Sequence, residues 1–192
     1  MKKVHIVTYT HWDREFRWEF ERTRMRLVDL FDHLFEIMEE KPEYRSFLCD
    51  GQFTLLEDYL EIRPEMKDTV KKYVEDGRLE IGPWFSLPDC APIQGESVVR
   101  NLQYGIKKSR EFGEPLKCGY NVFSFGQIGQ LPQIYQNFDI DTAIFYKYMD
   151  PEKSKYHEFI WESPDESKLI ASHLGPEARW NFFFAGHIPI VY

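Results

Sequence analysis

Short apolar runs alternate with helical segments along almost the whole of this 192-residue chain. The runs that predict β-strands are residues 4–9, 46–49, 78–84, 117–124 and 142–147. Between the first two runs, apolar residues recur at the spacing of one helix face, as Leu27, Phe31 and Leu34 do. Strands that alternate with helices are typical of parallel β/α units. The sequence therefore predicts an α/β fold with a mostly parallel sheet and flanking helices.

We find no internal repeat, low-complexity tract or linker, and we predict a single α/β domain over residues 1–192. A late pair of strands is predicted at residues 158–161 and 168–173, around a turn at residues 163–166. In parallel β/α folds, functional side chains gather at the carboxyl ends of the strands. The places that this rule selects follow Tyr9, Cys49, Trp84, Val122 and Phe145.

The composition predicts a globular protein and disfavours several kinds of partner. Hydrophobic residues make up 43% of the chain and charged residues 29%. The net charge of −8 argues against binding to nucleic acid. No apolar stretch approaches the length of a membrane span, and the first ten residues lack a signal peptide's apolar run, so we expect a cytoplasmic protein without a membrane partner. The odd number of cysteines, 3, predicts reduced thiols. The sequence leaves open whether the protein forms an oligomer.

A histidine and an aspartate follow the first predicted strand, in His11-Trp12-Asp13. Two such side chains on one turn can point at a single cation, and imidazole with carboxylate suits zinc or a similar divalent ion. The alternative is a solvated turn in which Asp13 caps the next helix. The spacing alone is a common one and leaves both interpretations open.

Several segments resemble glycoside hydrolase family 38, the α-mannosidases. Residues 119–134 read Gly-Tyr-Asn-Val-Phe-Ser-Phe-Gly-Gln-Ile-Gly-Gln-Leu-Pro-Gln-Ile, similar to the family's Gly-Tyr-x-Pro-Asp-Ser-Phe-Gly-Gln-x-Gly-x-x-Pro-Gln-Ile. Residues 9–16, Tyr-Thr-His-Trp-Asp-Arg-Glu-Phe, resemble the family's His-Ser-His-Trp-Asp-Arg-Glu-Trp. The resemblance extends over essentially the whole chain, which corresponds to the N-terminal part of the family's catalytic domain.

The resemblance implies a retaining, metal-dependent glycosidase built on an incomplete (β/α)7-type barrel. His11 and Asp13 match two of the family's metal ligands, and the metal would be zinc or a similar divalent ion. The turn Cys49-Asp50-Gly51-Gln52 is similar to the family's Leu-Asp-Gly-Gln. We interpret Asp50 as a turn residue that bonds local backbone amides.

The resemblance also implies a site for a mannoside or a related carbohydrate. Phe16 stands where the family has a tryptophan that stacks on sugar, and a phenyl ring offers a smaller stacking face. Trp84 and Asp89 would line the pocket, and Lys147 stands where the family has an arginine. We expect His11 and Asp13 to lie side by side at the carboxyl end of the first strand, near Asp89 and Phe123.

One position departs from the family's chemistry, because Phe123 stands where the family has its catalytic nucleophile, an aspartate that also binds the metal. A phenyl ring can neither attack an anomeric carbon nor coordinate a metal ion, and retaining glycosidases need two carboxyl groups. Cys90 likewise replaces a family glutamate. The family's general acid/base and its last metal ligand would lie beyond Tyr192. We therefore expect weak or absent zinc binding and no hydrolysis by this chain.

Two functional interpretations remain open. The chain is either an α-mannosidase-like glycoside hydrolase that has lost its nucleophile at Phe123, or a non-catalytic sugar-binding or structural pseudoenzyme or fragment. A polysaccharide deacetylase on a similar barrel is a weaker third interpretation. It shares only the His-x-Asp spacing, and the sequence holds no His-x-x-x-His pair.

Overall fold

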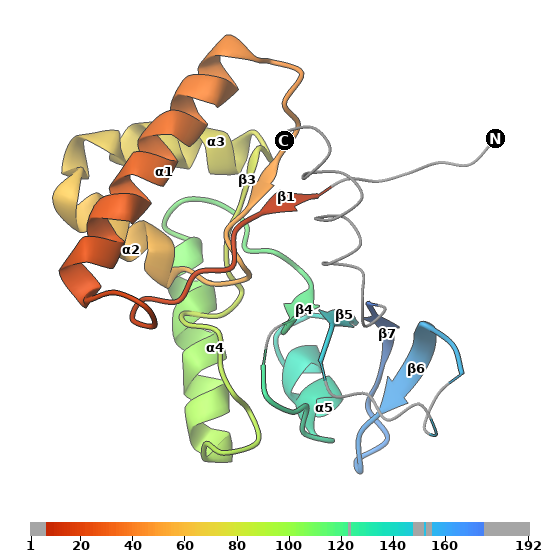
Figure 1. Ribbon diagram of the computed structural model, residues 1–192. Helices are drawn as coiled ribbons and strands as arrows, with labels where there is room; N and C mark the ends of the chain where they lie inside the picture. Colours follow the sequence, from red (N-terminus) through yellow and green to blue (C-terminus); the bar gives the residue numbers. More distant parts are fainter. Residues whose placement is uncertain (1–6, 123, 148–151, 153–154, 175–192) are drawn as a thin grey trace, which may run out of the picture. The chain divides into compact units, whose positions relative to one another are not determined.

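The computed structural model describes residues 7–122, 124–147, 152 and 155–174 (Figure 1). The chain divides into two compact units. Unit 1 is Met1–Leu87 with Arg100–Leu116, and unit 2 is Pro88–Val99 with Lys117–Tyr192. We describe each unit by itself, and the single domain over residues 1–192 stays a prediction.

Unit 1 holds a parallel sheet in the order β1-β2-β3, formed by β1 (Thr8–Tyr9), β2 (Phe47–Leu48) and β3 (Leu79–Glu80). These strands are shorter than the apolar runs that predict them. The third run ends early as a strand because Gly82 has a φ of 65° and the following Pro83 has no N–H to donate. A single parallel bridge from Gln52 to Trp84 continues the pairing beyond it.

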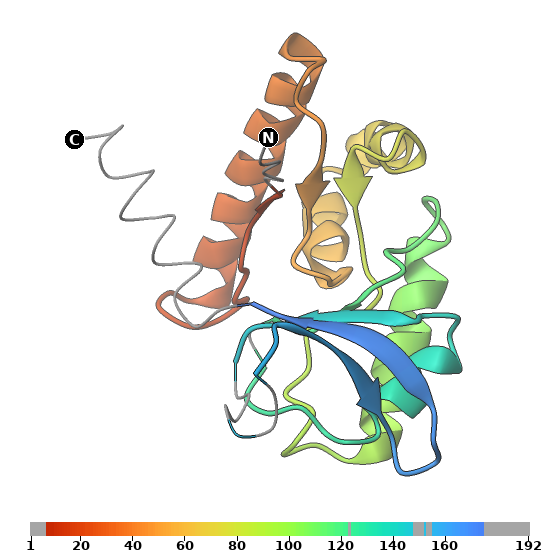
Figure 2. The same cartoon turned by 90° about the vertical axis from the view of Figure 1, so that its right-hand side faces the viewer.

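Helices pack on this sheet through one hydrophobic cluster. They are α1 (Phe20–Glu40), α2 (Thr54–Ile62) and α3 (Lys67–Glu75), and a short 3-10 turn at Pro64–Met66 precedes α3 (Figures 1 and 2). In the cluster, the ring of Phe31 on α1 lies 4.9 Å from that of Tyr59 on α2, centroid to centroid. The strand residues Phe47 and Leu79 belong to the same cluster, so it joins the helices to the sheet.

The end of α3 coincides with a turn signal in the sequence, Asp76-Gly77. Gly77 has a φ of 66°, a conformation that glycine adopts without steric cost. A further helix, α4 (Gly95–Ser109), has residues in both units. None of the described helices combines the length and apolar character that crossing a bilayer requires.

Unit 2 holds a second sheet in the order β4-β5-β7-β6. Its strands are β4 (Gly119–Tyr120), β5 (Thr142–Phe145), β6 (Glu158–Glu162) and β7 (Lys168–His173). β4, β5 and β7 run parallel, whereas β6 pairs with β7 in the antiparallel direction, which confirms the predicted late pair. The short helix α5 (Leu131–Gln136) was not predicted, because six residues are too few to show a helical apolar period.

The fold class is therefore confirmed as α/β, with mostly parallel strands and flanking helices. The parallel strands lie in two sheets, one in each unit, where the sequence predicts one. A pattern of apolar runs predicts which segments are strands, but not which strands share hydrogen bonds. Among the described residues, neither sheet closes into a barrel.

Candidate functional site

His11 and Asp13 lie on the loop that leaves β1, and the structure places their side chains together. His11 Nε2 is 3.5 Å from Asp13 Oδ1, and both side chains reach solvent. The other ring nitrogen, His11 Nδ1, lies 3.0 Å from Asp50 Oδ2. The two residues thus share one side of the loop, while their role as metal ligands stays a prediction.

Asp50 is the fully buried centre of this arrangement. Its Oδ2 accepts hydrogen bonds from Trp12 N at 3.1 Å and from Gln52 Nε2 at 3.1 Å, in addition to the contact with His11. Burial raises the pKa of the Asp50 carboxyl, and the contacts with His11, Trp12 and Gln52 act in the opposite direction. The backbone of Asp50 has a φ of 50°, a left-handed conformation that aspartate tolerates better than most residues.

This geometry corrects our interpretation of Asp50 as a residue that bonds only its own turn. Two of its partners, His11 and Trp12, come from the loop after β1, 38 to 39 positions away in the sequence. A carboxylate before glycine looks the same in a sequence whether it serves a turn or reaches a neighbouring loop. The signal available in the sequence was that the His11 and Asp50 turns both follow strands of a parallel sheet. The carboxyl ends of such strands meet at one edge of the sheet, so residues on the two turns can lie in contact.

The contact with Asp50 sets the chemistry of His11. A carboxylate at Nδ1 favours the tautomer that carries the proton there, so Nε2 has its lone pair on the side of Asp13. Carboxylates hold the ring of metal-binding histidines in this way and make the other nitrogen a better donor of electrons. The pair His11–Asp13 is therefore oriented as two ligands of one cation would be.

Two ligands make only part of a zinc site. Catalytic zinc is usually held by three protein side chains, and structural zinc by four. Within the described part of the chain, no group of three or more His, Cys, Asp or Glu side chains could hold a metal ion. The described residues thus fit a divalent metal in part, through His11 and Asp13.

The loop that carries these residues is fastened to α2. Arg14 Nε and Nη2 donate to the two carboxylate oxygens of Asp58 at 2.8 and 2.7 Å, and Asp58 is buried. A paired guanidinium–carboxylate contact of this kind fixes orientation as well as distance. Phe16, two residues further on, is 74% exposed, and Arg17 Cζ lies 5.8 Å from the centroid of its ring.

Trp84 lies at the opposite extreme of exposure, because its side chain is fully buried. Its backbone N donates to Gly51 O at 3.1 Å, which ties it to the turn that holds Asp50. The predicted contact of Trp84 with sugar stays a prediction.

In unit 2, two predicted substrate-binding residues converge on Phe125. Asp89 Oδ1 accepts a hydrogen bond from Phe125 N at 2.7 Å, and Lys147 Nζ lies 4.1 Å from the centroid of the Phe125 ring. An ammonium over a ring face is attracted by the ring's negative charge. Phe125 is thus the residue that brings Asp89 and Lys147 together, and the sequence had not singled it out. Phe123 lies outside the described residues.

Cys90, which stands where the family has a glutamate, does not supply a negative charge there at neutral pH. Burial raises the pKa of its thiol to about 12, although a hydrogen bond from Asn121 Nδ2 to Sγ acts in the other direction. At neutral pH the thiol is therefore protonated, and a protonated thiol is neither a base nor a strong nucleophile.

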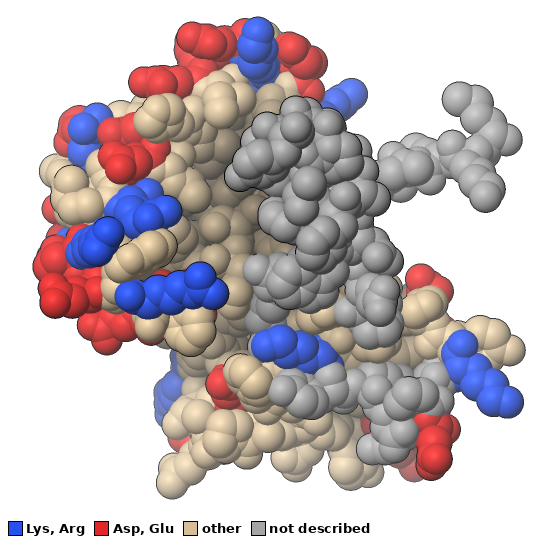
Figure 3. Space-filling view, in the orientation of Figure 1, with Lys and Arg blue, Asp and Glu red and all other residues tan. Residues whose placement is uncertain are grey.

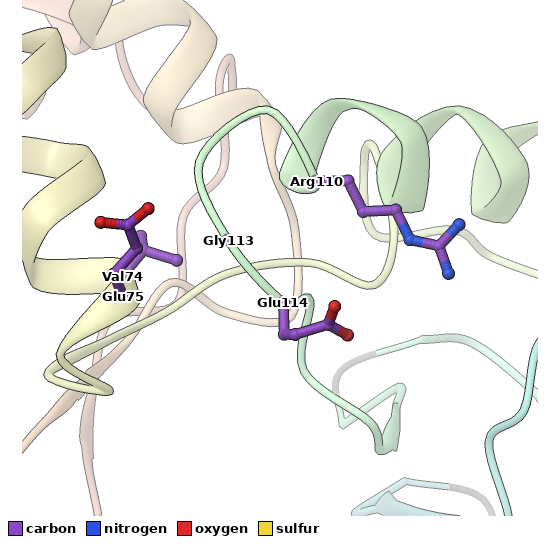
Figure 4. Close-up of a pocket in the computed structure, with 5 residues that line it drawn as sticks. All are labelled: Val74, Glu75, Arg110, Gly113 and Glu114. Carbon is purple, nitrogen blue, oxygen red and sulfur yellow. The ribbon is translucent and has the colours of Figure 1, made fainter.

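A separate hollow of about 550 Å³ in unit 1 contains none of the predicted site residues. Its walls come from the end of α3 and the segment after α4, and Figure 4 shows the five lining residues: Val74, Glu75, Arg110, Gly113 and Glu114. The carboxylates of Glu75 and Glu114 point in different directions there. The hollow therefore does not present the facing carboxyl pair that glycoside hydrolysis needs.

Comparison with known proteins gives consistent matches. The family described as "Glycosyl hydrolases family 38 N-terminal domain" matches residues 1–180. A protein of Halalkalibacterium halodurans named "Putative mannosylglycerate hydrolase" is 42% identical over 191 residues, covering 93% of this chain and 21% of that protein. "Alpha-mannosidase G" of Dictyostelium discoideum is 27% identical, covering 93% of this chain and 17% of that protein.

A solved structure agrees with these sequence matches. The crystal structure of an alpha-mannosidase from Enterococcus faecalis superimposes with a TM-score of 0.82 at 40% sequence identity. The match covers 88% of this chain and 19% of that one. The chain thus spans about a fifth of the length of these two relatives.

Proposed function

This chain belongs to glycosyl hydrolase family 38, and we propose that it binds α-mannosides without hydrolysing them. The arrangement of His11, Asp13 and Asp50 is the observation that carries the binding half of this proposal. A buried carboxylate fixes an exposed imidazole beside a second carboxylate, and such a preorganised polar group costs little to reorganise when a ligand arrives.

The substrate class comes from the relatives. Two of them are named alpha-mannosidases and one is named for mannosylglycerate. For this chain we therefore propose α-mannosides as ligands, with mannosylglycerate among them. His11 Nε2 and Asp13 Oδ1 can accept hydrogen bonds from sugar hydroxyls, and the exposed ring of Phe16 can stack on a pyranose face.

The non-catalytic half of the proposal depends on Phe123. Retaining hydrolysis needs one carboxylate that attacks the anomeric carbon and a second carboxyl group that moves the proton. The side chain of Phe123 has no electron pair for that attack, and the thiol of Cys90 is protonated at neutral pH. The nucleophile is thus missing from its position, and a second carboxylate of the family is replaced by a neutral thiol.

A divalent metal would be held by His11 and Asp13, and when bound it would supply positive charge to sugar hydroxyls. Two protein ligands are fewer than the three of a catalytic zinc site, so we propose weak binding. Asp50 contributes by keeping the proton on Nδ1 and the lone pair on Nε2.

An active hydrolase is the second candidate, and the 42% identity to a protein named as a hydrolase favours it. An assay of nitrophenol release from an α-mannoside, with and without added zinc, separates the two candidates. We expect no turnover above the uncatalysed rate from the wild type or from Phe123→Asp, because one carboxylate does not restore a pair. Zinc-dependent turnover by the wild-type chain would overturn the non-catalytic proposal.

Binding needs its own measurement, because an inactive protein gives no rate. Titration with methyl α-mannoside, followed by the NMR signals of His11 and Trp12, should give saturable shifts. His11→Ala should remove them, while the matched control His33→Ala, at an exposed position on the same unit, should not. Absence of any saturable shift would contradict sugar binding.

A further inference from the structure

Three arginines gather around two exposed aromatic rings at the start of α1. Arg26 and Arg22 lie over the ring of Trp18, with Cζ 4.1 and 5.4 Å from its centroid, and Arg17 Cζ lies 5.8 Å from the centroid of Phe16. We call Arg17, Arg22 and Arg26 the arginine cluster. Figure 3 shows blue side chains together with red ones around the beginning of α1.

The cluster differs from its neighbours in having no carboxylate partner. Arg14 is paired with Asp58, and Arg24 with both Glu21 and Glu61. Ion pairs between the described residues include none that involve Arg17, Arg22 or Arg26. Within one stretch of chain, two arginines are thus neutralised and three are not.

The placement of the unneutralised charges is costly without an anion. Arg22 and Arg26 are one helical turn apart, and like charges at this spacing repel each other. Both guanidiniums are also held against the same indole ring. A guanidinium with its face on a ring still has N–H groups at its edge, and these match the oxygens of a carboxylate or a phosphate.

Arg17 and Arg22 of the cluster line a hollow of about 540 Å³, large enough for a small ligand group. Its lining residues are Phe16, Arg17, Trp18, Glu19 and Arg22. Glu19 opposes an anion, but it is a single negative charge against the positive charges of the arginine cluster. The hollow begins three residues after Asp13, on the loop that the Arg14–Asp58 contact fastens.

We propose that the arginine cluster binds the negatively charged group of an acidic mannoside, a carboxylate or a phosphate, while the sugar lies at His11 and Asp13. This inference rests on the proposed function and specifies its ligand. The chain as a whole carries a charge of −8, so a local positive site is not a property of its general surface. The cluster would thus select charged mannosides over neutral ones.

The test compares three mannosides by NMR titration: mannosylglycerate, mannose 6-phosphate and neutral methyl α-mannoside. We expect one of the charged ligands to bind about three- to tenfold more tightly than the neutral one, a range set by exposed, charge-assisted contacts. The preferred ligand tells carboxylate from phosphate. The double variant Arg22→Gln/Arg26→Gln should erase this advantage and leave methyl α-mannoside affinity unchanged.

Two control variants make the result specific. Arg45→Gln removes the same charge from another exposed position of unit 1 and should preserve the advantage. Arg22→Lys/Arg26→Lys keeps the charge but loses the planar guanidinium, and should retain only part of the affinity advantage of the charged mannoside. Equal affinity for charged and neutral mannosides, or an advantage that persists in the glutamine variant, would overturn the proposal.

Failure of sugar binding is distinguishable from failure of the cluster. If no mannoside binds, the proposed function is wrong, and titration with glycerate and with inorganic phosphate decides the inference alone. A shift of the Trp18 indole N–H signal that disappears in Arg22→Gln/Arg26→Gln supports an anion site. No shift with either anion rejects it.

Discussion

The two units support their polar site residues in opposite ways. In unit 1, Asp50 is fully buried, and three donors from two different loops converge on one carboxylate oxygen. In unit 2, Asp89 is exposed to solvent, and Oδ1 receives a single backbone hydrogen bond from Phe125. The first arrangement depends on the correct packing of its surroundings, whereas the second depends on one local contact.

The difference shows what fixes each site in place. A buried carboxylate is expensive unless its hydrogen bonds are made, so the geometry around Asp50 is enforced by the cost of breaking it. Water can replace the bond to Asp89 at little cost, so its position depends on the backbone around Phe125. The His11–Asp13–Asp50 arrangement is thus preorganised, and the Asp89–Phe125–Lys147 arrangement is adaptable.

Cysteine reactivity gives the largest expected contrast between the units. Cys49 in unit 1 is fully buried, whereas Cys118 in unit 2 is partly exposed. Burial raises the pKa of both thiols, so at pH 8 each reacts only through a minor thiolate population or an opened state. We expect Cys49 to react with a disulfide reagent on the order of a thousandfold more slowly, because it requires opening of the core.

The variants Cys49→Ser and Cys118→Ser assign each kinetic phase of the thiol reaction to one cysteine, because each variant should remove one phase. Cys90, buried in unit 2, sharpens the comparison because its rate reports the opening of that unit. Similar rates for Cys49 and Cys118 would show that the core of unit 1 opens as readily as the surface of unit 2.

Replacing the two aspartates should give the next largest difference. Asp50→Ala removes an acceptor from three donors and places alanine at a φ of 50°, for a cost of roughly 2–4 kcal/mol in the free energy of unfolding. Asp89→Ala loses one exposed hydrogen bond and should cost less than about 1 kcal/mol. Urea unfolding followed by hydrogen exchange of peptides from each unit measures both.

Asp50→Asn is the matched control, since asparagine keeps the shape and tolerates the left-handed conformation. It should recover about half of the loss. Equal destabilisation by Asp50→Ala and Asp89→Ala would remove the distinction between the two sites.

Divalent metal binding should separate the units by about ten- to a hundredfold. We expect weak zinc binding by the wild type, seen as shifts of the His11 ring signals, because two ligands are present. Asp50→Asn should weaken it by about ten- to a hundredfold, as loss of a histidine-orienting carboxylate does elsewhere. Asp89→Asn should leave it unchanged, and a tight one-to-one zinc complex in calorimetry would contradict the expectation of weak binding.

Much of the fold follows from local patterns, and much of the site does not. The apolar runs and the glycine turns predict the strands and helix ends because these depend on residues close in sequence, such as Asp76 and Gly77. The role of Asp50 depends on a loop almost forty positions away, and that of Phe125 on Asp89 and Lys147. Contacts of this kind require tertiary structure, so no spacing rule reveals them.

The arginine cluster illustrates the same limit. Arg22 and Arg26 share a helix face, which the sequence shows, but their common contact with Trp18 depends on how the preceding loop turns back. The sequence also does not show which arginines pair with a carboxylate. The structure pairs Arg14 and Arg24 with carboxylates and leaves the arginine cluster without such a pair among the described residues.

Acid titration gives the smallest expected effect, through Glu80 on β3. Burial raises the pKa of this carboxyl above its usual value of 4.5, so the folded state holds the proton more tightly than the unfolded state does. The unfolded chain then binds fewer protons between the two pKa values, and stability falls as the pH rises through that window. Glu80→Gln removes the ionisation, so the melting temperature of this variant should exceed that of the wild type by more at pH 7 than at pH 4.

Glu158→Gln, at an exposed position of β6 in unit 2, is the matched control. If both variants gave the same difference at the two pH values, burial of charge would not distinguish the sheet of unit 1 from that of unit 2.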